Sequence, residues 1–272
     1  MEYKLIADSG STKTDWILVC KNGIEGRFST QGINPVMLDE QHIVEILQCE
    51  LLPHLDSIKI DAVDFYGAGC RGAQCDVVRS ALHVVFGIER IAVDSDMLGA
   101  ARALCGTDEG IVCILGTGSN SCLYDGQKIV ENVSPLGFIL GDEGSGAVLG
   151  KRLLGDMLKG QMPDVMVRLF AEEYGLTIDD IIRKVYREPM PNRFLASFAP
   201  FISHHRDCAE IRNLVVDEFR RFFIRNVSKY RRKDLPVHFV GSIAHYFRDE
   251  LTGVACDLGY RLGHIKKAPL DD

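Results

Sequence analysis

One unit of sequence occurs twice in this chain, about 106 residues apart. The first copy, KLIADSGSTKTDWILVCKNGIEGRF (4–28), has the pattern of a strand, a turn of small residues, a strand, an Asn-Gly turn and a third strand. The second copy, GIVCILGTGSNSCLYDGQKIVEN (110–132), repeats that order with an Asp-Gly turn. Such a duplication predicts two similar halves with a ligand cleft between them.

Strand and helix patterns alternate after the first copy. Apolar runs at 62–67 and 90–94 predict two more strands. Helical periodicity predicts a helix over 39–52, capped by Asp39, and another over 73–87, ended by Gly87. This alternation predicts an α/β protein whose sheet is largely parallel and covered by helices.

The second copy is followed by a mostly helical stretch, 144–232, and then by LPVHFVGSIAHYFRDEL (235–251), a strand that leads into a helix. At 272 residues the chain is long for a single core. We therefore expect two domains, 1–107 and 108–272, with the helical stretch inserted into the second.

Composition narrows the range of partners. The net charge of −7 disfavours nucleic acid or an anionic membrane as the main partner, since both bind a cationic face. No apolar run reaches the roughly 18 residues of a membrane span. The nine cysteines include no C-x-x-C pair and lie mostly in apolar segments, which predicts reduced thiols in a cytoplasmic protein.

The small-residue turns of the two copies, DSGSTKT and LGTGSNS, favour anion binding. Small residues let the backbone N–H groups of a tight turn converge on an anion, and hydroxyls and a lysine add donors. Neither turn is a Walker loop, because each lies between two strands rather than at the start of a helix. Either turn alone is consistent with an ordinary hairpin. Their equivalent places in two copies favour a shared phosphate ligand.

A competing signal is the literal G-x-G-x-x-G at Gly67, Gly69 and Gly72. It follows a strand, precedes a helix, and has Asp94 about 20 residues further on, as a dinucleotide site requires. The unit is the fourth strand of the chain rather than the first, and Cys70 and Arg71 crowd the turn. A dinucleotide oxidoreductase also leaves both small-residue turns unexplained.

With these motifs, the sequence resembles the N-acetylglucosamine kinase and benzoyl-CoA-reductase-activator ATPase family of the acetate-kinase, sugar-kinase, heat-shock-chaperone and actin superfamily. The resemblance covers nearly the whole chain. It is carried by DSGSTKTDW, VDSDMLGAARAL, GIVCILGTGSN, LGDEGSG and VHFVGSIA. The family fold implies two ribonuclease-H-like domains, each with a mixed five-stranded sheet, that close on ATP and substrate.

The resemblance implies a nucleotide site. Asp8 would contact the Mg²⁺ of ATP through water, in keeping with the few carboxylates that Mg²⁺ takes. Two phosphate loops and an adenosine segment would bind ATP: Gly10, Ser11, Thr12 and Lys13; Gly116, Thr117 and Gly118; Gly241 and Ser242. Ser9 and Ser11 depart from the family, which often has Gly there.

The resemblance assigns Asp96 as the general base. Phosphoryl transfer requires a carboxylate that accepts the proton of the attacking hydroxyl. The alternative is an acid that complements a helix N-terminus, with Ser95 as the cap. Asp94 is the neighbouring carboxylate with which it could be confused.

For sugar binding the family pattern implies Asn34, Gly69 and Asp142. Amide and carboxylate groups suit hydroxyl recognition, because a site built to bond a hydroxyl rejects analogues that lack it. Asn34 is equally consistent with an Asn-Pro turn, and Asp142 with Glu143 is consistent with charge at a helix start.

The resemblance implies an ATP-dependent kinase that phosphorylates an amino sugar, with N-acetylglucosamine and its 6-hydroxyl as the expected acceptor. The family is often dimeric, so a homodimer is a further expectation. One alternative is an ATP-driven activator, whose iron–sulfur cluster needs cysteines; Cys70 and Cys75 are the only close pair here. Another is a nucleotide sensor without turnover. His204, His205 and Cys208 are more consistent with a helix end than with a metal site.

Overall fold

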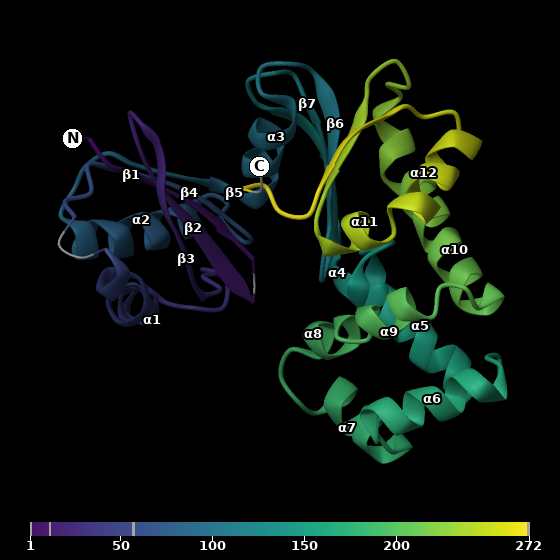
Figure 1. Cartoon of the computed structure of the whole chain (residues 1–272). Helices are drawn as coiled ribbons and strands as arrows, with labels where there is room; N and C mark the ends of the chain where they lie inside the picture. The colour runs from purple at the N-terminus through teal and green to yellow at the C-terminus, as the bar shows by residue number, and fades with distance from the viewer. Residues whose placement is uncertain (1, 11, 56–57, 271–272) are drawn as a thin grey trace. The chain divides into compact units, whose positions relative to one another are not determined.

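The protein forms two compact units, each built on one sheet (Figure 1). The computed structural model describes residues 2–10, 12–55 and 58–270. Unit 1 comprises the chain up to Ala103 together with the segment from Pro269, and unit 2 comprises Leu104–Ala268. The chain therefore passes from unit 1 to unit 2 and returns.

The sheet of unit 1 has the order β3-β2-β1-β4-β5. The first three strands are antiparallel neighbours, whereas β4 and β5 run parallel to β1. The strand bounds are β1 (Lys4–Ser9), β2 (Lys13–Cys20), β3 (Gly23–Gln31), β4 (Ala62–Gly67) and β5 (Ile91–Ser95). The antiparallel strands correspond to the first sequence copy, and the parallel ones follow helical crossovers.

Helices of unit 1 begin and end at the predicted signals. The Asp39 side chain accepts a hydrogen bond from the His42 N–H (3.0 Å) at the start of α1 (Glu40–Ile46). A π-helical turn (Leu47–Leu51) and a 3₁₀ turn (Leu52–His54) continue α1. These three segments together cover the helix predicted over 39–52. Helix α2 (Ala73–Phe86) ends at Gly87, which has a left-handed backbone (φ +64°).

The two faces of this sheet differ because side chains alternate along a strand. Leu5, Ala7 and Phe65 are fully buried in the core that the sheet forms with α1 and α2. Asp8 and Tyr66 point to the opposite face, where they line a pocket together with residues of α3 (Asp96–Cys105). The chemistry-bearing side chains of β1 and β4 thus lie on the face away from the main core.

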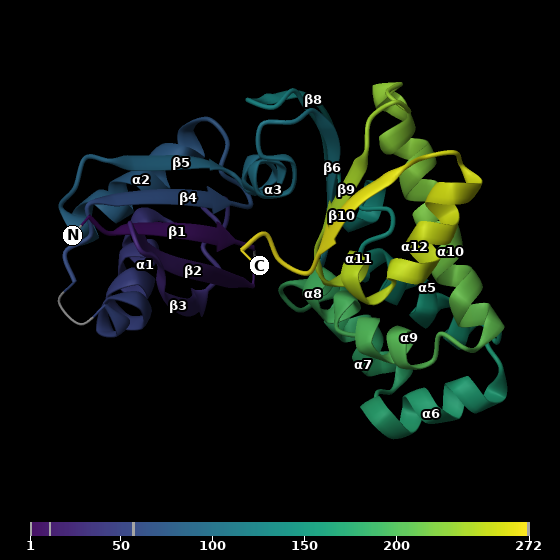
Figure 2. The same cartoon turned by 45° about the horizontal axis from the view of Figure 1, so that its top comes forward.

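The sheet of unit 2 repeats this topology in the order β10-β9-β6-β7-β8 (Figure 2). Again three antiparallel strands come from one sequence copy, and two parallel strands follow helical segments. The bounds are β6 (Gly110–Leu115), β7 (Ser119–Tyr124), β8 (Ile129–Val133), β9 (Val237–Val240) and β10 (Leu262–Lys266). Two mixed five-stranded sheets of the ribonuclease-H-like type are therefore confirmed.

The remainder of unit 2 is helical, as predicted. Three phenylalanines of α10 (Ala209–Arg225) are fully buried: Phe222 and Phe223 pack near Phe239 of β9, and Phe219 packs near Phe247. Burial of each such ring contributes about 1.5–3 kcal/mol. The helices are α4 (Gly137–Leu140), α5 (Gly146–Leu158), α6 (Asp164–Tyr174), α7 (Ile178–Tyr186), α8 (Pro191–Ala196), α9 (Ala199–His204), α10 (Ala209–Arg225), α11 (Ser242–Tyr246) and α12 (Arg248–Asp257), with a 3₁₀ turn at Val227–Tyr230. Within the described ranges, no helix has the length and apolar character needed to cross a membrane.

Candidate active site

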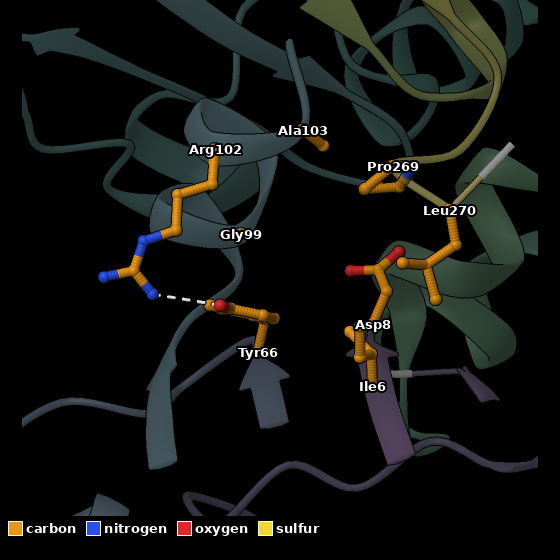
Figure 3. A pocket seen from close by; sticks show the side chains of 8 residues that line it. All are labelled: Ile6, Asp8, Tyr66, Gly99, Arg102, Ala103, Pro269 and Leu270. Atoms are coloured by element: carbon orange, nitrogen blue, oxygen red, sulfur yellow. Dashed lines mark hydrogen bonds between the residues drawn. The ribbon is translucent and has the colours of Figure 1, made fainter. Parts of the chain in front are cut away.

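Asp8 stands near the end of β1, beside the first small-residue turn. Its neighbours in register are Asp15 on β2 and Tyr66 on β4. It lines a pocket of about 220 Å³ whose other walls include Ile6 and Gly99 (Figure 3). A carboxylate at this place can bind a hydrated Mg²⁺, which takes one or two carboxylates and keeps most of its waters.

Ser9 is the internal anchor of the same turn. Its hydroxyl is fully buried, donates to the Ile33 carbonyl (2.9 Å) and lies 2.6 Å from the Thr14 hydroxyl. The Ile33 N–H donates back to Ser9 Oγ (3.0 Å), and the Ala68 N–H donates to the Ser9 carbonyl (2.8 Å). Ser9 therefore ties together the turn, the loop before Asn34 and the loop before Gly69. Its inward position in the alternation of β1 was the available sequence signal for this role.

The first turn itself is tight and polar. The Gly10 N–H donates to the Lys13 carbonyl (2.9 Å), and Lys13 Nζ forms an ion pair with Asp15 (2.8 Å). Thr12 is exposed, and Ser11 lies outside the described residues. The turn can offer backbone and side-chain donors to an anion.

Asn34 and Gly69 come together from two loops of unit 1. Gly69 has φ +83°, and a Cβ there would collide with Oδ1 of Asn34. The Asn34 side chain also accepts from the Val36 N–H (3.0 Å), so it forms the turn that the Asn-Pro pattern predicts. The Asn34 side chain therefore both forms the local turn and contacts the Gly69 loop.

Asp96 is the first residue of α3, directly after β5. Its Oδ1 accepts from the Met97 N–H (2.8 Å), and the Leu98 N–H donates to the Ser95 hydroxyl (3.3 Å). Ser95 thus caps the helix through the Leu98 N–H, while the Asp96 carboxylate bonds the adjacent Met97 N–H. Burial raises the pKa of Asp96, while the Met97 N–H and the positive charge of Arg71 act to lower it. A raised carboxyl pKa suits proton acceptance near neutral pH.

The second small-residue turn rests on the start of a helix in unit 2. The Gly116 carbonyl accepts from the Gly146 N–H (2.8 Å), and the Thr117 carbonyl accepts from the Ala147 N–H (3.1 Å). The Gly116 N–H donates to the Gly118 carbonyl (2.9 Å). These bonds hold the turn rigidly against the first turn of α5.

Gly241 and Ser242 lie next to that turn. A Cβ on Gly241 would collide with the Leu115 carbonyl and approach the Gly116 nitrogen (3.2 Å), and the residue has φ +123°. Only glycine satisfies both conditions. The segment that leads from β9 into α11 therefore runs directly against the second turn.

Asp142 stands over the other side of the second turn. Its Oδ1 accepts from the Ser119 N–H (3.3 Å), and its Oδ2 would lie 3.1 Å from a Cβ placed on Gly118. Its backbone is left-handed (φ +55°), which is uncommon for a residue other than glycine and is held here by a bond from its N–H to the Pro135 carbonyl. Burial raises the pKa of Asp142 to about 6, and the charge of Glu143 adds to the rise.

Glu143 has a structural position instead. It is buried, forms an ion pair with Arg225 and accepts from the Asn226 side chain (3.2 Å). Ser145, not either acid, caps α5 by accepting from the Val148 N–H (3.2 Å). The two neighbouring acids therefore have different tasks, and only Asp142 faces the turn.

The residues of the competing dinucleotide signal have other surroundings. Gly67 ends β4, which lies between β1 and β5 in a sheet with antiparallel strands on one side, unlike a doubly wound dinucleotide domain. Cys70 is buried, and burial raises its pKa to about 12, so it is a poor metal ligand or nucleophile. Among the described residues, no three His, Cys, Asp or Glu side chains form a metal-binding group.

The predicted site residues thus fall into one set in each unit. Unit 1 gathers its set around the ends of β1, β4 and β5: Asp8, Gly10, Thr12, Lys13, Asn34, Gly69 and Asp96. Unit 2 gathers its set around the end of β6: Gly116, Thr117, Gly118, Asp142, Gly241 and Ser242. Sequence reasoning missed Ser9 as an anchor and gave no role to Arg71.

Solved structures resemble this chain over nearly its whole length. One from Porphyromonas gingivalis, described as a candidate N-acetylglucosamine kinase, is 52% identical with a TM-score of 0.96, over 99% of this chain and 96% of that chain. One from Chromobacterium violaceum with the same description is 19% identical with a TM-score of 0.79, over 99% and 96%. A ROK family glucokinase from Streptomyces griseus, in complex with glucose and AMPPNP, shares the fold at 14% identity and a TM-score of 0.63, over 98% and 94%. No protein-family model and no curated protein matches the chain.

Proposed function

Because the chain belongs to the N-acetylglucosamine kinase family of the actin-like ATPase superfamily, we propose that it is an ATP-dependent sugar kinase. We propose an amino sugar as the acceptor, most specifically N-acetylglucosamine at its 6-hydroxyl. The description of the 52% identical relative supports that acceptor, and AMPPNP in the glucokinase supports ATP as the donor.

The observation that carries the proposal is the grouping of Asp96 with hydroxyl-binding groups in unit 1. Asp96 is within the electrostatic reach of Arg71, and Arg71 belongs to the same loop as Gly69, which contacts Asn34. In this assignment Asn34 orients the sugar and Asp96 accepts the proton of its hydroxyl. The half-buried setting of Asp96 raises its pKa, which favours a proton acceptor closer to neutrality.

The nucleotide residues divide by task. Asp8 would hold Mg²⁺ through its waters, and the bound ion would neutralise charge on the transferring phosphoryl group. Backbone donors and small side chains bind phosphate oxygens at both turns: Gly10, Ser11, Thr12 and Lys13 in unit 1, and Gly116, Thr117 and Gly118 in unit 2. Gly241 and Ser242 bound the adenosine, and Asp142 accepts hydrogen bonds from the sugar.

Two further expectations belong to this proposal. The nine cysteines are all free thiols, which supports a cytoplasmic enzyme. We also propose a homodimer, and the mass of the native protein in solution tests it.

Measurement of ADP release tests the proposed function. Purified protein is incubated with Mg²⁺ and ATP and with N-acetylglucosamine, glucosamine, glucose, N-acetylmuramic acid or no sugar. We expect N-acetylglucosamine to stimulate ADP release, and the stimulation to vanish in Asp96→Asn. Slow ADP release at a rate that no sugar changes would overturn the proposal in favour of an ATPase activator. Binding of ATP without turnover would favour a sensor.

A further inference from the structure

Tyr66 lies in a row of three polar side chains on the outer face of the unit 1 sheet. It pairs in register with Asp8 on β1 and with Asp94 on β5, and both pairings are parallel. Residues paired in this way point to the same face of a sheet. The neighbouring Phe65 is buried in the main core, so Tyr66 and its two acidic neighbours face α3.

Helix α3 holds the Tyr66 ring at two places (Figure 3). A Cβ on Gly99 would lie 2.7 Å from both Cβ and Cγ of Tyr66, so the helix backbone rests directly on the base of this side chain. At the other end of the ring, Arg102 Nη1 donates to the Tyr66 hydroxyl (2.9 Å), and the guanidinium lies 5.7 Å from the ring centroid. Arg102 also lies 3.6 Å from Asp94, which ties the helix to β5.

The same helix face carries the candidate base. Asp96, Gly99 and Arg102 are spaced three residues apart, and residues at this spacing lie along one side of an α-helix. Any shift of Gly99 or Arg102 over the Tyr66 ring therefore moves Asp96 as well. Tyr66 in turn belongs to the strand next to β1, which carries Asp8.

We propose that Tyr66 is a positioning residue for the phosphoryl transfer. Held between Gly99 and Arg102, it sets the placement of α3 on the sheet and so the placement of Asp96 relative to β1. The inference rests on the proposed function. It predicts that changes at Tyr66 lower kcat while substrate binding persists, because Asn34 and Gly69, the proposed sugar-binding pair, meet in two loops outside α3.

The first test is Tyr66→Phe, which keeps the ring and removes only the hydroxyl that Arg102 binds. Loss of one such hydrogen bond corresponds to about a 3- to 10-fold fall in kcat. We expect KM for ATP and for the sugar to stay within about twofold, and the acid limb of the kcat profile to keep its midpoint. Unchanged kcat, or a fall in kcat accompanied by an equal rise in KM, would overturn the proposal.

The second test is a double-mutant cycle of Gly99→Ala and Tyr66→Ala. In the natural background the new methyl group must displace α3 from the ring, and we expect kcat to fall by about 10- to 100-fold. In the Tyr66→Ala background the contacts with Cγ and the ring are gone and only the contact with Cβ remains, so Gly99→Ala should cost less. Equal effects of Gly99→Ala in the two backgrounds would contradict the coupling.

Gly253→Ala is the matched control, because Gly253 is an exposed helical glycine in α12 with open space around a new methyl group. It should leave kcat unchanged and raise the unfolding temperature slightly. The outcomes also separate the two proposals. If the natural protein phosphorylates no sugar, the proposed function fails and the positioning role falls with it. If it does and the Tyr66 variants equal it in kcat, only the positioning role fails.

Discussion

The two units share one sheet order but differ in where they place charge. In unit 1, the residue two before the turn glycine is Asp8, and the turn ends in Lys13. In unit 2, the residue two before Gly116 is Ile114, and the turn is held by backbone hydrogen bonds to α5. Its carboxylate, Asp142, comes from a separate loop with a left-handed backbone. The duplicated architecture thus has a small-residue turn in each unit, while the proposed metal and base carboxylates occur in one unit.

The largest expected effect is that of Asp96→Asn in unit 1. Loss of the proposed base should lower sugar-dependent kcat by about 10²–10⁴-fold, because an amide cannot accept the proton. ATP affinity, measured by calorimetry, should persist. Since burial raises the pKa of Asp96, kcat of the natural protein should fall on the acid side as this carboxylate is protonated.

Asp76→Asn is the control for that variant, because Asp76 is an exposed acid on α2 paired with Arg79. It should retain full turnover. Near-normal kcat in Asp96→Asn would contradict the assignment of the base to unit 1, since another residue would then have to accept the proton.

The next effect is that of Asp142→Asn in unit 2. Loss of a charged acceptor for sugar hydroxyls should lower kcat/KM for the sugar by about 10- to 100-fold. Sugar-concentration series at saturating ATP measure this change. An unaltered kcat/KM would exclude Asp142 from sugar binding.

Asp142→Asn should also be more stable to unfolding than the natural protein at alkaline pH. The folded-state pKa of Asp142 is raised to about 6, above the ordinary 3.8, so its stabilising contribution is complete below pH 3.8 and is lost as the pH rises through 6. Asparagine removes the cost of the buried charge, which we place at about 1 kcal/mol after solvent screening. The unfolding temperature should therefore exceed that of the natural protein by about 2–4 °C at pH 8 and match it at pH 4. Equal temperatures at pH 8 would contradict the raised pKa.

A smaller effect is expected from Gly116→Ala and its counterpart Gly10→Ala. Neither new methyl group meets a close neighbour, so both variants should fold with unchanged unfolding temperatures. Each should raise KM for ATP by about tenfold if backbone donors at these turns contact phosphate. Gly241→Ala, which collides with the Leu115 carbonyl, should instead unfold unit 2 at lower temperature. If only one of Gly10→Ala and Gly116→Ala alters KM, only that turn binds phosphate.

The smallest expected effect on substrate kinetics is that of Ser9→Ala, which changes the hydrogen bonds between loops of unit 1. Ser9→Ala removes a buried hydroxyl with several partners and should lower the free energy of unfolding by about 1–3 kcal/mol, with a few-fold rise in KM for the sugar. Urea unfolding measures the first effect. The control is Ser29→Ala, an exposed serine of the same sheet, which should change stability by less than about 0.5 kcal/mol. Equal losses in both variants would show that Ser9 is not an anchor.

Much of this fold could be predicted because local sequence patterns determine it. The duplicated strand-and-turn unit predicted the two equivalent sheets, and the capping chemistry of Asp39 and the left-handed Gly87 set helix ends. These features depend on neighbouring residues, so single-sequence reasoning reaches them.

The rest depends on contacts between distant segments. The bond from Arg27 to the Leu270 carbonyl (2.8 Å), which joins the end of the chain to unit 1, has no local signal. The contact of Asn34 with Gly69 and the place of Asp142 above Gly118 likewise need three-dimensional packing. Ser9 looked like a substitution for a family glycine, yet it is buried and multiply bonded.

The fate of the transferred phosphoryl group tests the proposed sugar kinase most directly. ³¹P and ¹H NMR of a reaction with N-acetylglucosamine, Mg²⁺ and ATP would identify the phosphorylated product. We expect a phosphomonoester coupled to the two protons on carbon 6, formed in step with ADP and absent with Asp96→Asn. Inorganic phosphate as the sole product, or a phosphate on the anomeric carbon, would contradict it.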